Sequence, residues 1–373
     1  MNLALISLLL TVGAAHAQPG TDQKPLMAED VFKNVQVLRG IPVNQFMETM
    51  GFFSAALGYN CTNCHGDEVL GNWARYADDV PIKRTARRMI QMVNTLNKGE
   101  FGGRRAVTCY SCHRGSGSPK VVPSLAEQYG EPPPDDPNEV EIARRAPATP
   151  TADDILNRYI QALGGAQRLA ALTTFAAKGT AEGFDTYHGK VAMELFAKAP
   201  GQRALIVHTQ NGDGATICDG RTAWITGPDR PLPVLQLAPG GDLDGARLDA
   251  QLAFPGNIRQ ALTQWRAGFP AATIDDREFQ VIQGTAGNSR VKLFFDKESG
   301  LLARQVRYEN TVVGLVPAQV DYSDYREVAG VKIPFQWVVT WTDGRSTFRF
   351  TEVQPNVAVD PAKFSKPAAP AAR

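Results

Sequence analysis

The sequence Cys61-Thr62-Asn63-Cys64-His65 is a C-x-x-C-H pattern, and the chain repeats it as Cys109-Tyr110-Ser111-Cys112-His113. In the attachment signature of a c-type haem, two thiols form thioethers to the vinyl groups and the next imidazole binds the iron. Two cysteines three positions apart lie on neighbouring corners of one helical turn, so both reach one porphyrin edge. Because both copies are complete, we expect two covalently bound haems c, with His65 and His113 as iron ligands.

Three other uses of paired cysteines compete with this interpretation. A zinc ion can be held by four thiolates from two C-x-x-C pairs, but this use leaves both histidines without a role. A redox dithiol needs one such pair beside a βαβ unit, and structural disulfides suit an exported protein. The complete and doubled motif favours haem. The fifth cysteine, Cys218, stands alone, and we expect it to be a small buried apolar residue.

The first residues have the pattern of an export signal. An apolar run from Leu3 to Val12 precedes Ala15-His16-Ala17, which resembles an A-x-A cleavage site. The run is shorter than the roughly 20 residues that span a bilayer, and no cysteine near the cleavage site offers a place for a lipid. We therefore expect a signal peptide at residues 1–17 and a soluble periplasmic protein with no lipid anchor.

Composition divides the chain into two domains. The hydrophobic content is 43% and the net charge is +1, which fits a globular protein and gives no sign of nucleic-acid binding. From Gly115 to Pro150 the chain is rich in Gly, Ser and Pro, and this composition predicts a linker. The boundaries that we expect are a di-haem domain at 18–118, the linker at 119–150, a second domain at 151–365 and a disordered tail at 366–373.

The first domain is predicted to be mainly α-helical. Apolar residues recur at helical spacing over Val43 to Leu57 and over Ile82 to Leu96, and a loop and one C-x-x-C-H motif follow each helix. The helices carry four methionines, namely Met47, Met50, Met89 and Met92. A methionine thioether opposite histidine is a common sixth iron ligand that raises the reduction potential, although methionine at helical spacing is more often core filling. Spacing alone does not decide which methionine binds.

Two segments of this domain resemble the cytochrome c subunit of bacterial photosynthetic reaction centres. They contain Asn34-Val35-Gln36-Val37-Leu38, Gln45-Phe46-Met47-Glu48-Thr49-Met50, Ala86-Arg87-Arg88-Met89-Ile90-Gln91-Met92 and both C-x-x-C-H motifs. The resemblance implies that Met50 binds the first iron and Met89 the second, which leaves Met47 and Met92 as core residues. That family usually carries four haems and a membrane tether, whereas this chain matches only the first pair. The partners that it implies are redox proteins: a membrane-bound electron-transfer complex, such as a reaction centre, or a soluble carrier.

Basic residues cluster before the second motif. Arg87 and Arg88 adjoin Met89, and the planar fork of arginine suits a haem propionate. A solvated helix face is the alternative interpretation. The sequence leaves both interpretations open for Arg87 and Arg88, which are candidate propionate partners.

The second domain is predicted to be an α+β antiparallel half-barrel with helices on one face. Thr151 caps a helix that stops at Gly164-Gly165, and a further helix is expected over Leu248 to Trp265. Ten alternating segments between 190 and 353 predict strands. The pattern resembles the periplasmic carriers that sort outer-membrane lipoproteins, through Tyr322-Ser323-Asp324-Tyr325-Arg326 and Gly330-Val331-Lys332-Ile333-Pro334. This resemblance implies an apolar ligand on the concave face.

Two functions from different classes follow from these patterns. The first is an electron carrier in which His and Met fill both axial positions of each iron, so that no substrate is transformed and the chain is not an enzyme. The second is a periplasmic protein that binds an apolar ligand or senses redox state or a gas. A haem peroxidase needs a positioned acid or base, and the first domain has no further histidine to supply one.

Overall fold

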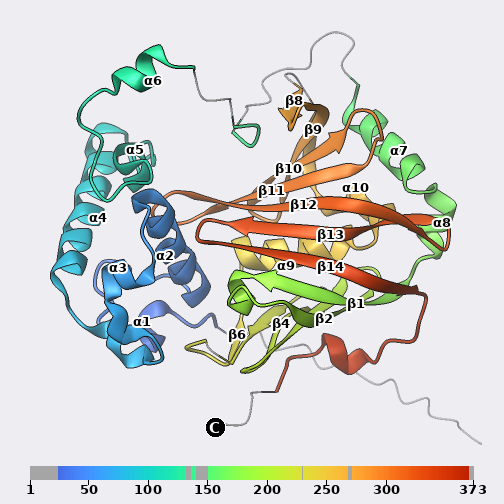
Figure 1. Ribbon diagram of the computed structural model, residues 1–373, viewed down its shortest axis with the longest axis horizontal. Helices are drawn as coiled ribbons and strands as arrows, with labels where there is room; N and C mark the ends of the chain where they lie inside the picture. Colours follow the sequence, from blue (N-terminus) through green and yellow to red (C-terminus); the bar gives the residue numbers. More distant parts are fainter. Residues whose placement is uncertain (1–23, 132–135, 140–149, 229, 268–270, 369–373) are drawn as a thin grey trace, which may run out of the picture.

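The computed structural model describes residues 24–131, 136–139, 150–228, 230–267 and 271–368. These residues form a helical region that lies beside one large sheet (Figure 1). The expected signal peptide and the last residues of the expected tail lie outside the described residues. The helical region contains α1 (Ala28–Val31), α2 (Val43–Leu57), α3 (Cys61–His65), α4 (Pro81–Glu100), α5 (Cys109–His113), α6 (Leu125–Tyr129) and the 3-10 turns η1 (Asp67–Val69) and η2 (Trp73–Ala77).

Both long helices predicted from the sequence are present. Helix α2 has the expected bounds and ends where Gly58 adopts a left-handed conformation with φ of 64°. Helix α4 begins with Pro81, and proline is tolerated there because N–H groups in the first turn of a helix have no partner within the helix. The helix extends beyond the expected Ile82 to Leu96 at both ends. Each helix precedes a one-turn helix formed by one C-x-x-C-H motif, so the repeat seen in the sequence is also a structural repeat.

The sheet is antiparallel throughout and has 14 strands. Their order is β6-β5-β4-β3-β2-β1-β14-β13-β12-β11-β10-β9-β7, and β8 pairs with β9. Pairing of β1 with β14 therefore joins the first and last strands of the domain in its middle. The strands are β1 (Thr174–Gly183), β2 (Val191–Lys198), β3 (Gln202–Thr209), β4 (Gly212–Cys218), β5 (Ala223–Thr226), β6 (Val234–Gln236), β7 (Thr263–Ala267), β8 (Ala272–Ile274), β9 (Arg277–Ala286), β10 (Ser289–Asp296), β11 (Leu302–Asn310), β12 (Leu315–Val328), β13 (Val331–Trp341) and β14 (Gly344–Pro355).

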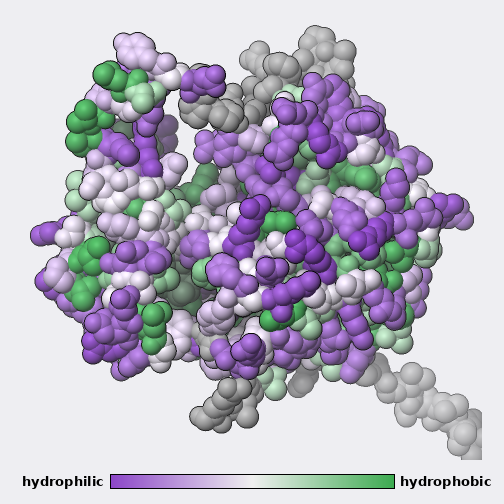
Figure 2. All heavy atoms as spheres, in the orientation of Figure 1, coloured by the Kyte–Doolittle hydropathy of each residue, from purple (hydrophilic) through white to green (hydrophobic). Residues whose placement is uncertain are grey.

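Helices cover one face of this sheet. In Figure 1, α9 (Gly241–Leu252) and α10 (Ile258–Ala261) lie behind it, while α7 (Ala152–Ala162) and α8 (Ala166–Ala171) lie at its end. The largest apolar core joins these helices to the sheet through residues such as Tyr159, Leu248, Ile258 and Phe295. Figure 2 shows that the opposite face of the sheet is mostly hydrophilic. The predicted fold class is therefore confirmed.

The prediction of one helix over Leu248 to Trp265 is wrong. Helix α9 starts earlier and ends at Leu252, and a 3-10 turn, η4 (Pro255–Asn257), follows it. Proline fixes its own backbone and cannot donate the hydrogen bond that a continuous helix needs at that position. The chain then forms the single turn of α10 and enters β7, so Trp265 lies in a strand.

A short piece of the expected linker is fixed to the sheet by Asn138. Its backbone oxygen accepts a hydrogen bond of 2.7 Å from the Lys292 Nζ atom and another from the Tyr308 hydroxyl. Its side-chain Nδ2 donates to Gln319 Oε1 at 2.7 Å. The buried lysine thereby gains a polar partner, and the linker lies against the sheet at this point.

The two regions also share a small apolar core. Phe52 and Ala56 of α2 are buried together with Val313 and Val316, which come from the β11–β12 hairpin, and the half-buried Cys109 packs against them. Burial of apolar side chains drives such packing. The hairpin therefore joins the sheet to the helix that precedes the first motif and to the second motif itself.

Candidate haem sites

The first motif folds as a single capped helical turn. Asn60 precedes it, and its Oδ1 accepts a hydrogen bond of 3.1 Å from the Asn63 backbone N–H. Asn63 Oδ1 in turn accepts one of 2.8 Å from the Asn60 N–H. This reciprocal capping box satisfies two N–H groups that a short helix leaves without partners. The variable position before Cys64 therefore stabilises the turn that brings Cys61 and Cys64 together.

The second motif uses a similar device. Ser111 occupies the position that Asn63 has in the first motif, and its Oγ accepts a hydrogen bond of 3.0 Å from the Thr108 N–H. Arg114 ends the turn in a left-handed conformation with φ of 51°. The Gly115 N–H then donates to the Ala56 oxygen of α2 at 3.0 Å, so the end of the second motif rests on the helix that leads to the first.

The His65 ring lies against an aromatic pair. Its centroid lies 4.8 Å from that of Tyr76, which stacks on Trp73 at 5.0 Å. Burial, assisted by the Lys83 ammonium, lowers the pKa of His65 to about 4. The imidazole is therefore neutral near pH 7, which is the form that binds a metal. Its Nδ1 atom is buried and has no hydrogen-bond partner within the described residues.

The His113 ring is oriented by its own loop. Its Nδ1 atom lies 2.9 Å from the Ser116 backbone oxygen, so Nδ1 carries the proton and donates it to that carbonyl. This bond leaves Nε2 with a free lone pair, which is the usual arrangement of a histidine ligand to a metal. The residues of the second motif thus fit a haem iron as well as its vinyl groups.

All five cysteines are free thiols. Burial raises the pKa values of Cys61, Cys64 and Cys109, so these groups are neutral near pH 7. Among the described residues, no three cysteine or histidine side chains place ligand atoms within 4.8 Å of one another, which a shared four-thiolate zinc site requires. The structure therefore favours neither the zinc nor the disulfide interpretation.

The methionines do not divide as expected. Met47 and Met92 are 42% and 53% exposed, so the expectation that they are core residues is wrong. Met50 is half-buried and packs on the apolar cluster of α1 and α2, whereas Met89 is 40% exposed. Helix α4 buries Ile90 and leaves Ile82, Met89, Met92 and Leu96 exposed. An exposed apolar stripe of this kind is a surface that a bound macrocycle would cover.

The two arginines next to Met89 have different environments. Arg87 forms an ion pair with Asp79, and this hydrogen bond lowers the pKa of that carboxyl. Arg88 donates to Thr85 Oγ1 at 3.3 Å. The Arg87 side chain is only 17% exposed, so Arg88 is the more accessible of the two expected propionate partners.

Two further residues position the motifs, and we did not predict them. Lys83 Nζ donates to the backbone oxygens of Tyr76 and Asp78 at 2.9 and 2.7 Å, which fixes the loop that carries the Tyr76 ring over His65. Asn97 is 6% exposed, and its Oδ1 accepts from the N–H groups of Ala106 and Val107 at 3.0 Å each. Its Nδ2 donates to the Val107 oxygen at 2.7 Å. Asn97 thereby anchors the segment immediately before Cys109.

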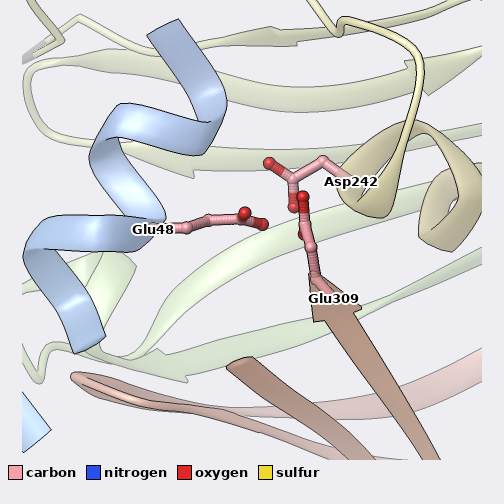
Figure 3. A group of neighbouring side chains, drawn as sticks. All are labelled: Glu48, Asp242 and Glu309. Atoms are coloured by element: carbon pink, nitrogen blue, oxygen red, sulfur yellow. The ribbon is translucent and has the colours of Figure 1, made fainter. Parts of the chain in front are cut away.

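Three carboxyl groups meet where the two regions join. Figure 3 shows Glu48 of α2 pointing toward Asp242 at the start of α9 and Glu309 at the end of β11. Their oxygens lie within 4.8 Å of one another. Arg307 contacts Glu309 at 3.3 Å and Asp242 at 3.7 Å. Burial, reinforced by the neighbouring carboxylates, raises the pKa of Glu48 far above its usual range and also raises the pKa of Glu309.

The structure thus combines a helical region that holds two one-turn C-x-x-C-H helices with a helix-covered antiparallel sheet. Residues 10–164 match the family model described as photosynthetic reaction centre cytochrome C subunit. The chain is 37% identical to the photosynthetic reaction center cytochrome c subunit of Thermochromatium tepidum over 108 residues, which are 28% of this chain and 26% of that one. The Roseobacter denitrificans subunit is 33% identical over 103 residues, 26% and 27% of the two chains. The chain thus spans about a quarter of the length of these relatives.

The sheet domain resembles solved structures of another kind. A LolA superfamily protein from Nitrosomonas europaea has 14% identity and a TM-score of 0.39, and the match covers 58% of this chain and 99% of that one. A DUF1329 family protein from Desulfovibrio piger has 12% identity and the same TM-score, with 58% and 98% covered. Both resemblances expected from the sequence are therefore found. Within the described residues, no helix has the length and apolar character of a membrane span.

Proposed function

We propose that the chain is a periplasmic di-haem c-type cytochrome that transfers electrons. In this proposal, Cys61 and Cys64 attach the first haem and His65 binds its iron. Cys109, Cys112 and His113 do the same for the second. The observation that carries the proposal is that both motifs form capped one-turn helices with two free thiols and a histidine next to them.

Bound haem would supply one-electron exchange between ferric and ferrous iron, and the side chains around it would bind the iron and set its reduction potential. The neutral His65 ring and the oriented His113 ring each present a nitrogen lone pair. Met50 would supply a thioether to the first iron and Met89 one to the second, and thioether ligation would favour the ferrous state. Arg87 and Arg88 are proposed to neutralise propionates.

The exposed apolar stripe of α4 supports this assignment for Met89, because Ile82, Met92 and Leu96 lie beside it on the same helix face. Met50 is less accessible, since it packs in an apolar cluster. The exposed Met47 lies one helical turn earlier and is the competing ligand of the first iron. The proposed redox partner is a membrane-bound electron-transfer complex or a soluble carrier, and the chain is proposed to transform no substrate.

The second candidate function is binding of an apolar ligand by the sheet domain. Its concave side is filled by α9, α10 and the core residues around Leu248 and Ile258. A pocket of about 440 Å³ lies elsewhere, and its lining is polar: Gln264, Arg266, Gln283, Gly284, Thr285 and Arg290. Ligand pockets for apolar molecules have mainly apolar linings. The polar residues around this pocket do not fit an apolar ligand there.

The test is expression of the full chain in a periplasm that contains haem-attachment machinery. A mass increase equal to two haems, a thioether-type haemochrome spectrum and two low-spin redox steps with a methionine-to-iron charge-transfer band would support the proposal. High-spin iron that binds carbon monoxide would instead support a sensor. Absence of covalent haem would refute the proposal and return the four cysteines to zinc or disulfides.

A further inference from the structure

The hairpin between β11 and β12 reaches from the sheet to the second motif. Its tip, Asn310 to Leu315, is tied to the helical region at two points. Gln45 Nε2 of α2 donates to the Asn310 backbone oxygen at 3.1 Å, and Arg105 Nη1 donates to Asn310 Oδ1 at 3.2 Å. Arg105 lies in the loop that leads to Cys109. One residue of the sheet domain therefore contacts the elements before both motifs.

The backbone of the tip lies close to the residue before Cys109. Thr311 donates to the Gly314 oxygen through its N–H and its hydroxyl, at 2.9 Å each, which makes the turn tight. A Cβ on Gly314, whose φ is +157°, would lie 3.1 Å from the Phe52 ring and 3.2 Å from Thr108 Cγ2. Glycine is therefore needed for this close approach.

Two valines of the tip share a small pocket with the second motif. The pocket has a volume of about 10 Å³, and its lining consists of Cys109, the apolar Val312, Val313, Ile90 and Val93, and the polar Asn94, Asn97 and Arg105. Val313 is buried, at 8% exposure, whereas Val312 is 36% exposed. An apolar side chain from the sheet domain thus lies partly open to solvent beside the thiol that is expected to hold the second haem.

We propose that the β11–β12 tip forms one wall of the second haem site, so that the sheet domain helps to set the reduction potential of that haem. This inference rests on the proposed function. Val312 and Val313 lie beside Cys109 and would exclude water from a haem attached there. A dry apolar surrounding disfavours the extra positive charge of ferric iron and so raises the potential.

The test compares two substitutions on the same hairpin. Val312→Asp places a carboxylate in the wall, and Leu315→Asp places one at the start of β12, where Leu315 is 46% exposed and does not line the pocket. Because both side chains are substantially exposed, we expect both variants to fold with unchanged unfolding midpoints. In a redox titration, Val312→Asp should lower the reduction equilibrium constant of the second haem about tenfold, or ~59 mV for one electron. Leu315→Asp should leave both haems unchanged.

Two additional variants complete the design. Val312→Asn is uncharged, and a smaller decrease of the same potential in this variant would separate the effect of water from that of charge. The double change Cys109→Ala and Cys112→Ala removes the second attachment, so the step that remains in the titration belongs to the first haem.

The outcomes distinguish this inference from the proposed function. Covalent haem at both motifs, together with equal shifts of the second reduction potential in Val312→Asp and Leu315→Asp or with no shift in either, would refute the role of the tip. The proposed electron transfer would still stand. A decrease confined to the first haem would also refute the wall. If the wild-type protein carries no second haem by mass, both proposals fail.

Discussion

Replacing Asn97 with Ala would test whether this buried amide holds the second motif in place. The substitution removes three hydrogen bonds of 2.7 to 3.0 Å to Ala106 and Val107. Each hydrogen bond contributes about 1 kcal/mol net to the free energy of unfolding, and the better helix propensity of Ala offsets about 0.6 kcal/mol of the loss. We therefore expect the free energy of unfolding to fall by about 2 kcal/mol, together with a lower haem content at Cys109 and Cys112.

The matched control is Asn94→Ala. Asn94 is an exposed residue of the same type on the same helix. It borders the small pocket beside Cys109, but the described part of the chain shows no hydrogen bond from its side chain. Surface changes of this kind usually alter stability by no more than about 0.5 kcal/mol. Urea unfolding gives the free energies, and mass spectrometry of the expressed chain gives the haem content. Equal results for the two variants would show that Asn97 does not anchor the motif.

Three further changes test other parts of the structure. Met89→Ala should abolish the methionine charge-transfer band of one haem and lower its potential, whereas Met92→Ala should not, and equal spectra would exclude Met89 as the ligand. Gly58→Ala should destabilise the chain by about 2 kcal/mol or more, because a Cβ there lies 2.3 Å from the Gly115 oxygen at a φ of +64°. The control Gly40→Ala has a similar φ of +77° but open space, and should cost only about 1 kcal/mol in urea unfolding. Glu309 has a raised pKa in the folded state, chiefly through burial, so stability falls as pH rises from the ordinary value of 4.5 toward the raised folded-state value. Glu309→Gln removes this term, so the stability of the variant relative to wild type in urea unfolding should increase as pH rises above 4.5, and a difference that does not change with pH would contradict the assignment.

The features that could be predicted from the sequence are those with a local physical cause. The C-x-x-C-H pattern, the apolar stripes of α2 and α4 and the alternation of most strands each depend on neighbouring residues. Asn60 and Thr108 stand directly before the motifs as helix caps, and Asn and Thr before a short helix are a local signal of this kind. Strand β1 was missed: its central Ala-Ala-Lys-Gly-Thr-Ala segment is poor in β-branched and aromatic residues.

Features that depend on contacts between distant segments could not be predicted in this way. Asn97 is one polar residue in an amphipathic helix, and only its burial against Val107 gives it a role. The carboxyl cluster brings together Glu48, Asp242 and Glu309 from three elements that have no common pattern in the sequence. The exposure of Met92 follows from which face of α4 packs on the hairpin, and periodicity identifies an apolar face without identifying its partner.

Composition divides the chain into two domains, and apolar packing, hydrogen bonds and a carboxylate connect them. The β11–β12 tip adds an apolar core around Phe52 and two hydrogen bonds through Asn310. The turn after β13 brings Thr342 and Asp343 against Gly51 of α2, where a Cβ would lie 2.7 Å from the Thr342 hydroxyl. Asp343 also lies near enough to Cys61 to raise the pKa of that thiol, after burial. Each motif therefore has one hairpin of the sheet beside it, apolar at Cys109 and acidic at Cys61. Since a nearby carboxylate would stabilise ferric iron and an apolar wall would destabilise it, we expect the haems proposed at the two motifs to differ in reduction potential.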